Sequence, residues 1–368
     1  MHASSLIRQL AEIRPEIQFE GFGGRRMEAA GCRLHADILH LAGMGFSFLQ
    51  NIMAFVGLLR RFYKLTRDHP PDALVLVDFP GFNFLLARLA KLQGVPVVYY
   101  ICPQIWAWAP WRRKKILRLT DLLMAIFPFE VDFYGGADDR VVYVGHPLAD
   151  ALAEVSDPDA MARNFRKTHE INDEDFVVGV FPGSRDHEVT SLLPFYRKTL
   201  ERLELNGKSP VMVSCCRDRY RSQIEEQLGS LSTPATIVDG DARPLMAACD
   251  VALVASGTAT LELAFFEKPM MVSYRVNRRD YWIYRFICTS PFVSLVNILA
   301  QRRVVPEEVT YKDSASDLNM SQLKAFVDDE AARESCREDL RSLKDDVFQP
   351  GGSRTAAETL VRFLEERS

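Results

Sequence analysis

Several signals of common protein classes are missing from this sequence. No apolar run reaches the roughly 20 residues that a helix needs to cross a bilayer, and the nearest stretch, 38–64, is interrupted by His40, Gln50 and Asn51. The seven cysteines form no CxxC pair and the seven histidines form no HxH or HxxxH pair, so no metal site is expected. Buried, reduced thiols and a cytosolic location are the simplest interpretation.

Strong charge and the common nucleotide motifs are also missing. A net charge of -4 over 368 residues argues against a protein that coats nucleic acid. The sequence contains neither a GxxxxGK[ST] phosphate loop nor a GxGxxG segment. These absences argue against P-loop NTPases and against oxidoreductases that bind dinucleotides.

Short apolar runs alternate with helical patterns, which predicts parallel sheets covered by helices on both faces. The predicted strands are 72–79, 95–102, 122–127, 141–145, 176–184, 210–216, 235–240, 251–257 and 269–276. The polar segment 149–175 contains no predicted strand and marks a domain boundary. We therefore predict an α/β protein with two doubly wound, Rossmann-like domains, 1–155 and 156–345, and a ligand site in the cleft between them. A last helix, within 346–368, is expected to pack back on the first domain.

The segment FPGSRDHEV, residues 181–189, follows a predicted strand and opens a helix. Gly183 allows a tight turn, Ser184 is suited to cap the helix, and Arg185 places a positive charge at its N-terminus. These features suit a phosphate or diphosphate. A capped turn without a ligand has the same pattern, so this segment alone does not decide between them.

A second segment, VALVASGTATLELA at 251–264, has the same organisation. Small residues end its strand and begin the next helix: Ser256, Gly257, Thr258 and Thr260. Exposed amides there suit a diphosphate, and the carboxylate of Glu262, one turn later, suits the two hydroxyls of a ribose. Helix capping would favour the same residues, but two such loops in one domain favour a nucleoside diphosphate.

Two side chains of the first domain are candidates for chemistry. Asp78, in VDFPGFN, follows a strand and precedes a Pro-Gly turn, so it is expected to face the cleft, where a carboxylate can act as a general base. His146, in VGHPLAD, stands at another strand end, where it could donate to a substrate oxygen. Each has a structural alternative: a turn carboxylate for Asp78 and a buried, satisfied histidine for His146.

Two stretches suggest an amphiphilic ligand or a membrane surface. Residues 43–64 are apolar and then basic, as in a helix lying in a membrane interface, although a buried helix of an α/β domain is the alternative. Residues 105–115 combine three tryptophans, including Trp106, with four basic residues, which suits an amphiphile with an anionic head. RNA binding by stacking and charge is the rival. The acidic balance of the chain weakens it, and no nucleic acid partner is expected.

In their order and spacing these motifs resemble the lipid-A-disaccharide synthases, which are inverting glycosyltransferases of the GT-B fold. The resemblance spans the whole chain and rests on VDFPGFN, YYICPQIWAW, FPFE, VGHPLAD, PGSRDHEV, SGTATLELA, PMMVSYRV and FVSLVNILA. It implies that UDP-2,3-diacylglucosamine is joined to 2,3-diacylglucosamine 1-phosphate, giving lipid A disaccharide 1-phosphate and UDP. It implies no metal and no cofactor.

The resemblance also implies roles for single residues. Asp78 would remove the proton from the 6-hydroxyl of the acceptor, and Asn83 would help to orient that base. Trp106 and His146 would belong to the substrate site. Nucleotide binding is implied for the two loops and for one further asparagine: Gly183, Ser184, Arg185, Ser256, Gly257, Thr258, Thr260, Glu262 and Asn297.

The resemblance further implies a peripheral enzyme on the cytoplasmic face of the inner membrane, attached through 43–64 and 105–115. Its place would be lipid A and lipopolysaccharide biosynthesis, and so biogenesis of the bacterial outer membrane. The oligomeric state stays open, with a homodimer as one option. Two alternatives fit the same motifs: another GT-B glycosyltransferase with a lipid-linked acceptor, and an inactive protein that binds nucleotide sugars.

One departure from the family concerns the first residues. MHASSLI resembles a family helix that follows a strand and a GExSGD loop, and neither precedes it in this sequence. A start codon assigned too late is the favoured explanation, ahead of a trimmed chain or a loss of function. We expect a gap in the first sheet beside the active site, and hence a chain of reduced stability and poor activity.

Overall fold

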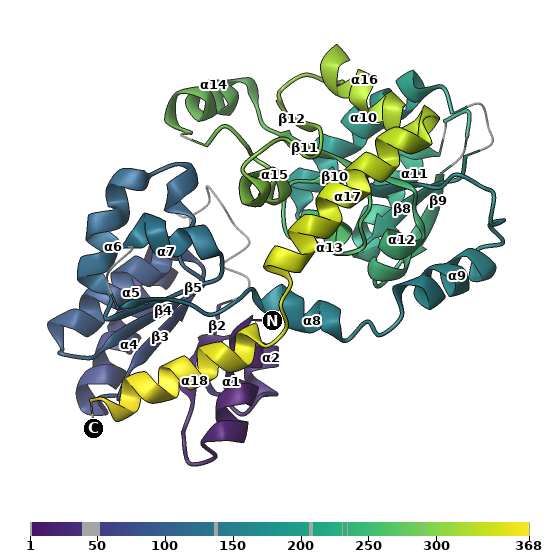
Figure 1. Ribbon diagram of the computed structural model, residues 1–368. Coiled ribbons are helices and arrows are strands. Elements are labelled where there is room, and N and C mark those ends of the chain that lie inside the picture. The colour runs from purple at the N-terminus through teal and green to yellow at the C-terminus, as the bar shows by residue number, and fades with distance from the viewer. Residues whose placement is uncertain are drawn as a thin grey trace. The chain divides into compact units, whose positions relative to one another are not determined.

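The computed structural model describes residues 2–38, 52–135, 139–205, 209–229, 231–233, 235–288 and 290–367 (Figure 1). The chain divides into two compact units. Unit 1 is Met1–Ala151 with Val347–Ser368, and unit 2 is Leu152–Asp346. Every pair of described neighbouring strands runs parallel, which confirms the predicted α/β class. The domain limits inferred from the sequence stay predictions.

Unit 1 has six described strands, arranged in two sheets. They are β1 (Glu20–Gly23), β2 (Arg33–Asp37), β3 (Leu74–Val77), β4 (Val97–Tyr100), β5 (Leu122–Ala125) and β6 (Val141–Tyr143). Its helices are α1 (His2–Ile13), α2 (Arg25–Glu28), α4 (Ile52–Asp68), α5 (Pro80–Leu92), η2 (Ile105–Ala107), η3 (Pro110–Arg112), α6 (Arg113–Leu119), α7 (Pro128–Tyr134), α8 (Pro147–Ala153) and α18 (Gly352–Glu365).

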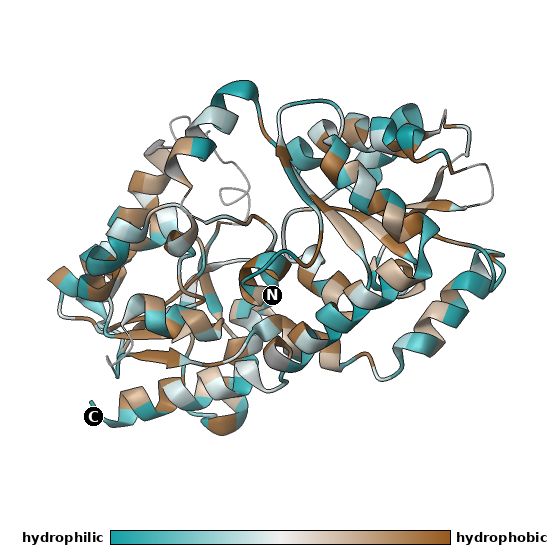
Figure 2. Ribbon diagram, turned by 45° about the horizontal axis from the view of Figure 1, so that its top comes forward, coloured by the Kyte–Doolittle hydropathy of each residue, from teal (hydrophilic) through white to brown (hydrophobic). Residues whose placement is uncertain are grey.

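The larger sheet of unit 1 has the order β3-β4-β5-β6. All residues of β4 and β5 are buried, because helices cover both faces of the sheet. Burial on two faces explains why these strands are continuous apolar runs instead of alternating patterns. Figure 2 shows the strands as largely apolar segments, whereas many helices carry a polar side. Phe55 and Phe62 of α4 and Phe82 and Leu86 of α5 belong to the core on this sheet.

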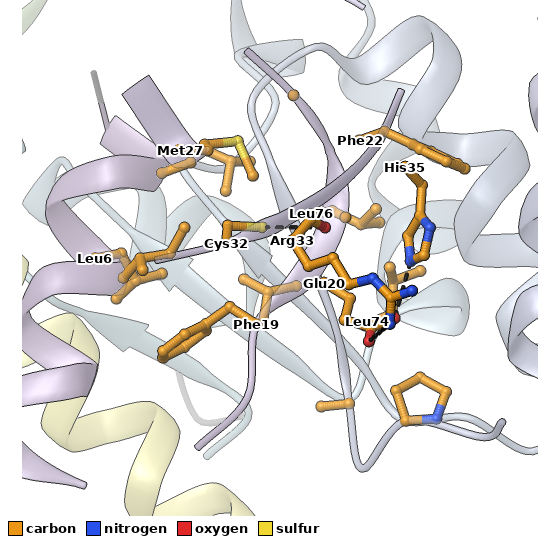
Figure 3. Close-up of a pocket in the computed structure, with 18 of the residues that line it drawn as sticks. Leu6, Phe19, Glu20, Phe22, Met27, Cys32, Arg33, His35, Leu74 and Leu76 are labelled. Atoms are coloured by element: carbon orange, nitrogen blue, oxygen red, sulfur yellow. Dashed lines mark hydrogen bonds and ion pairs between the residues drawn. The ribbon is translucent and has the colours of Figure 1, made fainter. Parts of the chain in front are cut away.

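The smaller sheet of unit 1 is separate from the larger one. Among the described strands β1 pairs with β2 alone, and β3 pairs with β4 alone. A cavity of about 1420 Å³ is lined by residues of α1, β1, β2 and β3. Figure 3 shows residues from β1, including Glu20 and Phe22, and residues from β3, Leu74 and Leu76, around it. The expected gap in the first sheet stays a prediction.

Unit 2 has one sheet of six strands, β7 (Val178–Phe181), β8 (Val211–Cys215), β9 (Ala235–Asp239), β10 (Val251–Ala255), β11 (Met270–Arg275) and β12 (Glu307–Thr310). Its order is β12-β11-β10-β7-β8-β9, so the direction of winding reverses between β7 and β10. The helices are α9 (Pro158–Thr168), α10 (Asp186–Leu203), η4 (Asp218–Tyr220), α11 (Arg221–Leu228), α12 (Arg243–Ala248), α13 (Ala259–Phe265), α14 (Arg278–Ile287), α15 (Leu295–Ala300), α16 (Asp317–Asp328) and α17 (Glu330–Val347).

The last helix, α18, is joined to the rest of unit 1 by a polar and a steric contact. The Asp150 carboxylate accepts hydrogen bonds from the backbone N–H groups of Gly351, Gly352 and Ser353, at 2.6, 3.1 and 2.8 Å. Gly145 has a φ of +86°, and a Cβ atom there would lie 3.1 Å from the Cα of Gly352. The carboxylate therefore satisfies the open N–H groups of the first helical turn. The glycines allow the two backbones to approach closely.

Replacing Asp150 with Ala should loosen α18. The variant leaves three backbone N–H groups of the helix start without their acceptor, and we expect a loss of about 2 kcal/mol. Hydrogen exchange of the α18 amides should then become about thirtyfold faster. D159A, at an exposed position in the first turn of α9, is the control and should leave α18 unchanged. Equal exchange in D150A and wild type would contradict this assignment.

Candidate functional site

The turn after β3 holds Asp78 in an uncommon backbone conformation. Asp78 and Phe79 have φ values of 48° and 41°, a region that residues with a Cβ atom seldom adopt. The Asp78 carbonyl oxygen accepts from Asn83 Nδ2 at 2.6 Å and from the Tyr99 hydroxyl at 2.7 Å, and the Asp78 N–H donates to the Tyr100 carbonyl at 3.2 Å. Backbone strain of this kind persists where surrounding contacts enforce it and is typical of functional sites. The Asp78 side chain is exposed at the end of the strand.

The Asn83 side chain supports the backbone of the turn at Asp78. The Asn83 side chain is buried and also donates to the Val77 carbonyl at 3.3 Å. It therefore holds the backbone of the turn and does not hydrogen-bond the Asp78 carboxylate. The predicted orienting role is compatible with this contact through the backbone.

His146 is buried at the end of β6 and is held in one tautomer. Its Nδ1 atom accepts from the Leu148 N–H at 3.1 Å, so the proton of the neutral ring is on Nε2. Burial, with a smaller contribution from the nearby His2, lowers the pKa of His146 to about 4. Burial also lowers the pKa of His2, and the negative charge of Asp78 opposes that shift. His2 therefore lies within electrostatic range of both candidate residues.

Trp106 belongs to a buried polar contact that the sequence did not lead us to expect. Its indole Nε1 donates to Glu130 Oε1 at 3.1 Å, and Glu130 Oε2 accepts from the N–H groups of Ile126 and Phe127 at 3.1 and 3.2 Å. Glu130 has no exposed surface. Burial raises the pKa of Glu130 to about 7, against the opposing effect of these hydrogen bonds. A Glu three residues after the N-cap residue Phe127, in FPFE, is the sequence signal for such a cap.

The stability of unit 1 should depend on the ionisation of Glu130. The folded protein binds the Glu130 proton more tightly than an unfolded chain with a pKa near 4.5. Protonated Glu130 therefore adds to the free energy of unfolding, and this addition is complete below about pH 4.5. It is lost as the pH rises from about 4.5 to about 7, by up to about 3 kcal/mol. E130Q should lack this dependence. Urea unfolding of both proteins between pH 5 and 8 measures it.

The comparison with wild type isolates Glu130 from other titrating groups. The lowered pKa values of His2 and His146 give the opposite slope in both proteins, because folded groups that resist protonation are favoured as the pH rises. E12Q, at an exposed glutamate of α1, is the matched control and should keep the wild-type slope. Equal slopes in E130Q and wild type would mean that Glu130 is ionised in the folded protein throughout this range.

In unit 2 the two predicted nucleotide loops lie at the reversal point of the sheet. One loop follows β7 and the other follows β10, and these strands are paired neighbours. The carboxyl ends of parallel strands meet at one edge of a sheet, so the loops are adjacent there. In doubly wound sheets this crevice is the usual ligand site.

In the loop after β7, a carboxylate of the protein itself occupies the backbone N–H groups. The Glu188 carboxylate accepts from the backbone N–H groups of Ser184 and Arg185 at 3.0 and 3.2 Å, and it also pairs with the Arg185 guanidinium at 2.8 Å. Gly183, with a φ of +104°, leaves room for that carboxylate, since a Cβ atom would lie 2.5 Å from its oxygen. The amides predicted for a phosphate are thus occupied, and Arg185, which is mostly exposed, is the group that can reach a ligand.

The loop after β10 is more open. Gly257 and Thr258 are exposed, whereas Thr260 is buried and donates its hydroxyl to the Gly257 carbonyl at 2.7 Å. The Ser256 N–H donates to the Ser273 carbonyl of β11 at 2.9 Å, which fixes the start of the loop. Among the described residues no acceptor is recorded for the N–H groups of Gly257 and Thr258. Thr260 shapes this loop, and Gly257 and Thr258 are its accessible part.

Glu262 lies near a charged pair from the turn after β9. Burial raises the pKa of Glu262, and Arg243 and Asp241 shift it further in opposite directions. Arg243 itself pairs with Asp241, with Nε 2.8 Å from one carboxylate oxygen. Arg243 and Asp241 were not selected from the sequence, because they follow a strand that carries no recognisable loop motif.

A model of the family described as lipid-A-disaccharide synthetase matches residues 1–352. The chain belongs to the lipid-A-disaccharide synthetase family. Lipid-A-disaccharide synthases of Geobacter sulfurreducens and Myxococcus xanthus are 33% and 35% identical to it, over 99% of this chain and 94% of each relative. An S. aureus MnaA–UDP structure has a TM-score of 0.65 at 14% identity, over 98% of this chain and 93% of that one. At that identity the likeness concerns the fold alone.

One further motif of the synthetase family, FVSLVNILA, contains Asn297. Asn297 is fully buried, and its side chain uses all its hydrogen-bonding positions on protein groups. It donates to the Val305 carbonyl and to Glu307, and it accepts from the N–H groups of Val304 and Val305. Asn297 thus fixes the chain around α15. The predicted contact with the nucleotide stays a prediction.

The two amphiphilic stretches are partly described. Residues 43–51 lie outside the described residues, and α4 buries Phe55 and Phe62 while exposing Arg60, Arg61 and Lys64. In 105–115 Trp108 and Trp111 have exposed fractions of 40% and 65%. No helix among the described residues has the length and apolarity to cross a membrane. No group of three His, Cys, Asp or Glu side chains suited to a metal occurs in that part of the chain.

Proposed function

We propose that the protein joins UDP-2,3-diacylglucosamine to 2,3-diacylglucosamine 1-phosphate and releases UDP. The protein is a UDP-sugar-dependent glycosyltransferase of lipid A disaccharide synthesis, as its family shows. The single observation that carries the proposal is the family match over residues 1–352. The exposed carboxylate after β3 and the paired loops after β7 and β10 supply chemistry that fits this reaction.

The proposed base is Asp78. Its carboxylate takes the proton of the acceptor 6-hydroxyl while that oxygen forms a bond to the anomeric carbon of the donor. The bond from that carbon to the diphosphate oxygen breaks, and UDP leaves with the electron pair. Attack opposite to the leaving group inverts the anomeric centre and gives a β linkage. The contacts of Asn83 and Tyr99 to the Asp78 carbonyl support a fixed position for the base.

The leaving diphosphate needs positive charge and hydrogen-bond donors. We assign these to the Arg185 guanidinium and to the accessible amides of Gly257 and Thr258. Glu262 is the proposed acceptor for the ribose hydroxyls, and its half-buried carboxylate supports that assignment. Ser184, Ser256, Thr260 and Asn297 are proposed to shape these loops.

The acylated substrates require contact with lipid. We propose that Trp108, Trp111 and the basic residues 112–115 take part in peripheral attachment to the cytoplasmic face of the inner membrane, together with 43–64. The exposed tryptophans and the position of Arg112 over the Trp108 ring, at 5.0 Å, support an amphiphilic surface.

D78N should strongly lower turnover and preserve nucleotide binding. Loss of a general base costs about a hundredfold to ten-thousandfold in rate, so disaccharide formation measured by mass spectrometry should fall within that range. UDP affinity, measured by calorimetry, should match wild type, because Asp78 belongs to unit 1 and the nucleotide loops to unit 2. D132N, at an exposed position of α7, is the control. A D78N enzyme that retains most of its turnover would rule out Asp78 as the base.

We also propose that one parallel strand completes the first sheet between β1 and β3. The Leu74 and Asp78 N–H groups donate to the carbonyls of Pro96 and Tyr100, on the β4 side, at 2.8 and 3.2 Å. In a parallel ladder the alternate residues, Val75 and Val77, then direct their backbone groups the other way, toward the cavity. A strand there would run into α1 and on to β1, as a right-handed crossover does. Its end would lie beside Asp78, since Asp78 and His2 both line the cavity.

The test compares this chain with the same chain lengthened upstream to the nearest in-frame start codon. We expect the lengthened form to unfold at a higher temperature and to form disaccharide faster, because added backbone bonds would close the gap. A lengthened form with a proline in the middle of the added strand should lose both gains. Equal stability and equal turnover of the two forms would refute this proposal and leave the role of Asp78 untouched.

A further inference from the structure

Helix α14 of unit 2 carries an exposed face that no proposed part of the reaction uses. Trp282 and Phe286 are four residues apart, so they lie on one side of the helix. Their exposed fractions are 52% and 85%, and the second value is the highest among the large apolar side chains of the described residues. Figure 1 shows α14 at the periphery of unit 2. Two exposed aromatic side chains on one helix face indicate a contact surface.

The same face is positively charged. Arg278, Arg279 and Arg285 are exposed on α14, and none of them forms an ion pair with a carboxylate of the described residues. Asp280 is the one acidic residue of the helix, and it is held by the capping side chain of Asn277, with contacts of 2.7 and 2.8 Å. Aromatic and basic side chains thus share one side of the helix.

The opposite side of α14 attaches it to unit 2. The Tyr281 ring meets the Tyr311 ring edge-on, with centroids 5.1 Å apart, and Tyr281 and Tyr284 are only partly exposed. Arg278 also lies over the Tyr311 ring, 6.0 Å from its centroid, so the helix is anchored through Tyr281 and Arg278 and exposes Trp282, Arg285 and Phe286. This is the arrangement of a helix that lies in a membrane interface, with aromatic groups toward the lipid and arginines at the headgroups.

We propose that α14 binds the surface of a membrane that contains anionic lipid. A second copy of this chain fits less well, because a twofold contact through this face would bring the arginines of both copies together. The helix begins just after β11, whose partner β10 leads into the loop at Gly257 and Thr258. Binding through α14 would therefore bring the sheet edge that carries this loop close to the lipid. The inference adds to the proposed function and does not depend on catalysis.

The test is cosedimentation with vesicles of phosphatidylcholine, with and without phosphatidylglycerol, using the full chain. W282S/F286S should bind anionic vesicles about tenfold more weakly than wild type, and R279Q/R285Q should lose a similar factor on anionic vesicles only. L318S, at an exposed leucine of α16, and R163Q/K167Q, at two exposed positions of α9, are matched controls that should bind like wild type.

A second readout locates Trp282 directly. Brominated lipid in anionic vesicles should quench wild-type fluorescence more than that of W282F, which keeps an aromatic ring but lacks the reporter. Wild-type binding in both α14 double variants, or equal quenching of W282F and wild type, would overturn the proposal. So would loss of self-association in W282S/F286S, measured by sedimentation, without a change in vesicle binding. If W108S/W111S binds vesicles like wild type while the α14 variants lose binding, only the membrane surface proposed for unit 1 is ruled out.

Discussion

The parallel direction of every described strand pair is the constraint on which the rest of this structure depends. Parallel neighbours cannot be joined by a hairpin, so a crossover must follow each strand, and all the strand-to-helix turns of a sheet collect at one edge. In unit 1 that edge gathers Asp78 after β3, Trp106 after β4, Glu130 after β5 and His146 at the end of β6. Residues that are far apart in the sequence become neighbours because of this one rule.

The strands that carry the site were predictable, whereas β1, β2 and β12 were not. β4 and β5 are buried on both faces, so their sequences are apolar throughout and identify them. β1, with the sequence EGFG, carries neither alternation nor an apolar run. In β2, with the sequence RLHAD, the alternation rests on Leu34 and Ala36 alone, which is too weak to identify a strand. The polar strand β12, EEVT, lies at the edge of its sheet and was missed for the same reason.

The partners of the site residues were harder to predict than the residues themselves. The spacing of Gly183, Ser184 and Arg185 suggested an open anion site, but Glu188 occupies their amides. Glu130 does the same for the turn after β5. In both places a glutamate stands three residues into a helix that follows a strand, which is a recognised capping pattern. A motif alone does not tell whether a ligand or a nearby carboxylate satisfies such amides, because the two share the same chemistry.

The cavity beside β3 bears on how firmly the proposed base is held. With a volume of about 1420 Å³, it exceeds the range of about 300–1000 Å³ usual for small-molecule sites, and two strand edges contribute to its lining. Val75 and Val77 of β3 are partly exposed, and backbone groups cost free energy only where they leave water without a partner. Among the described residues, the strained turn at Asp78 and Phe79 is held by hydrogen bonds from Asn83 of α5 and with Tyr99 and Tyr100 of β4. The rigidity of the proposed base therefore depends on how the other side of that strand is covered.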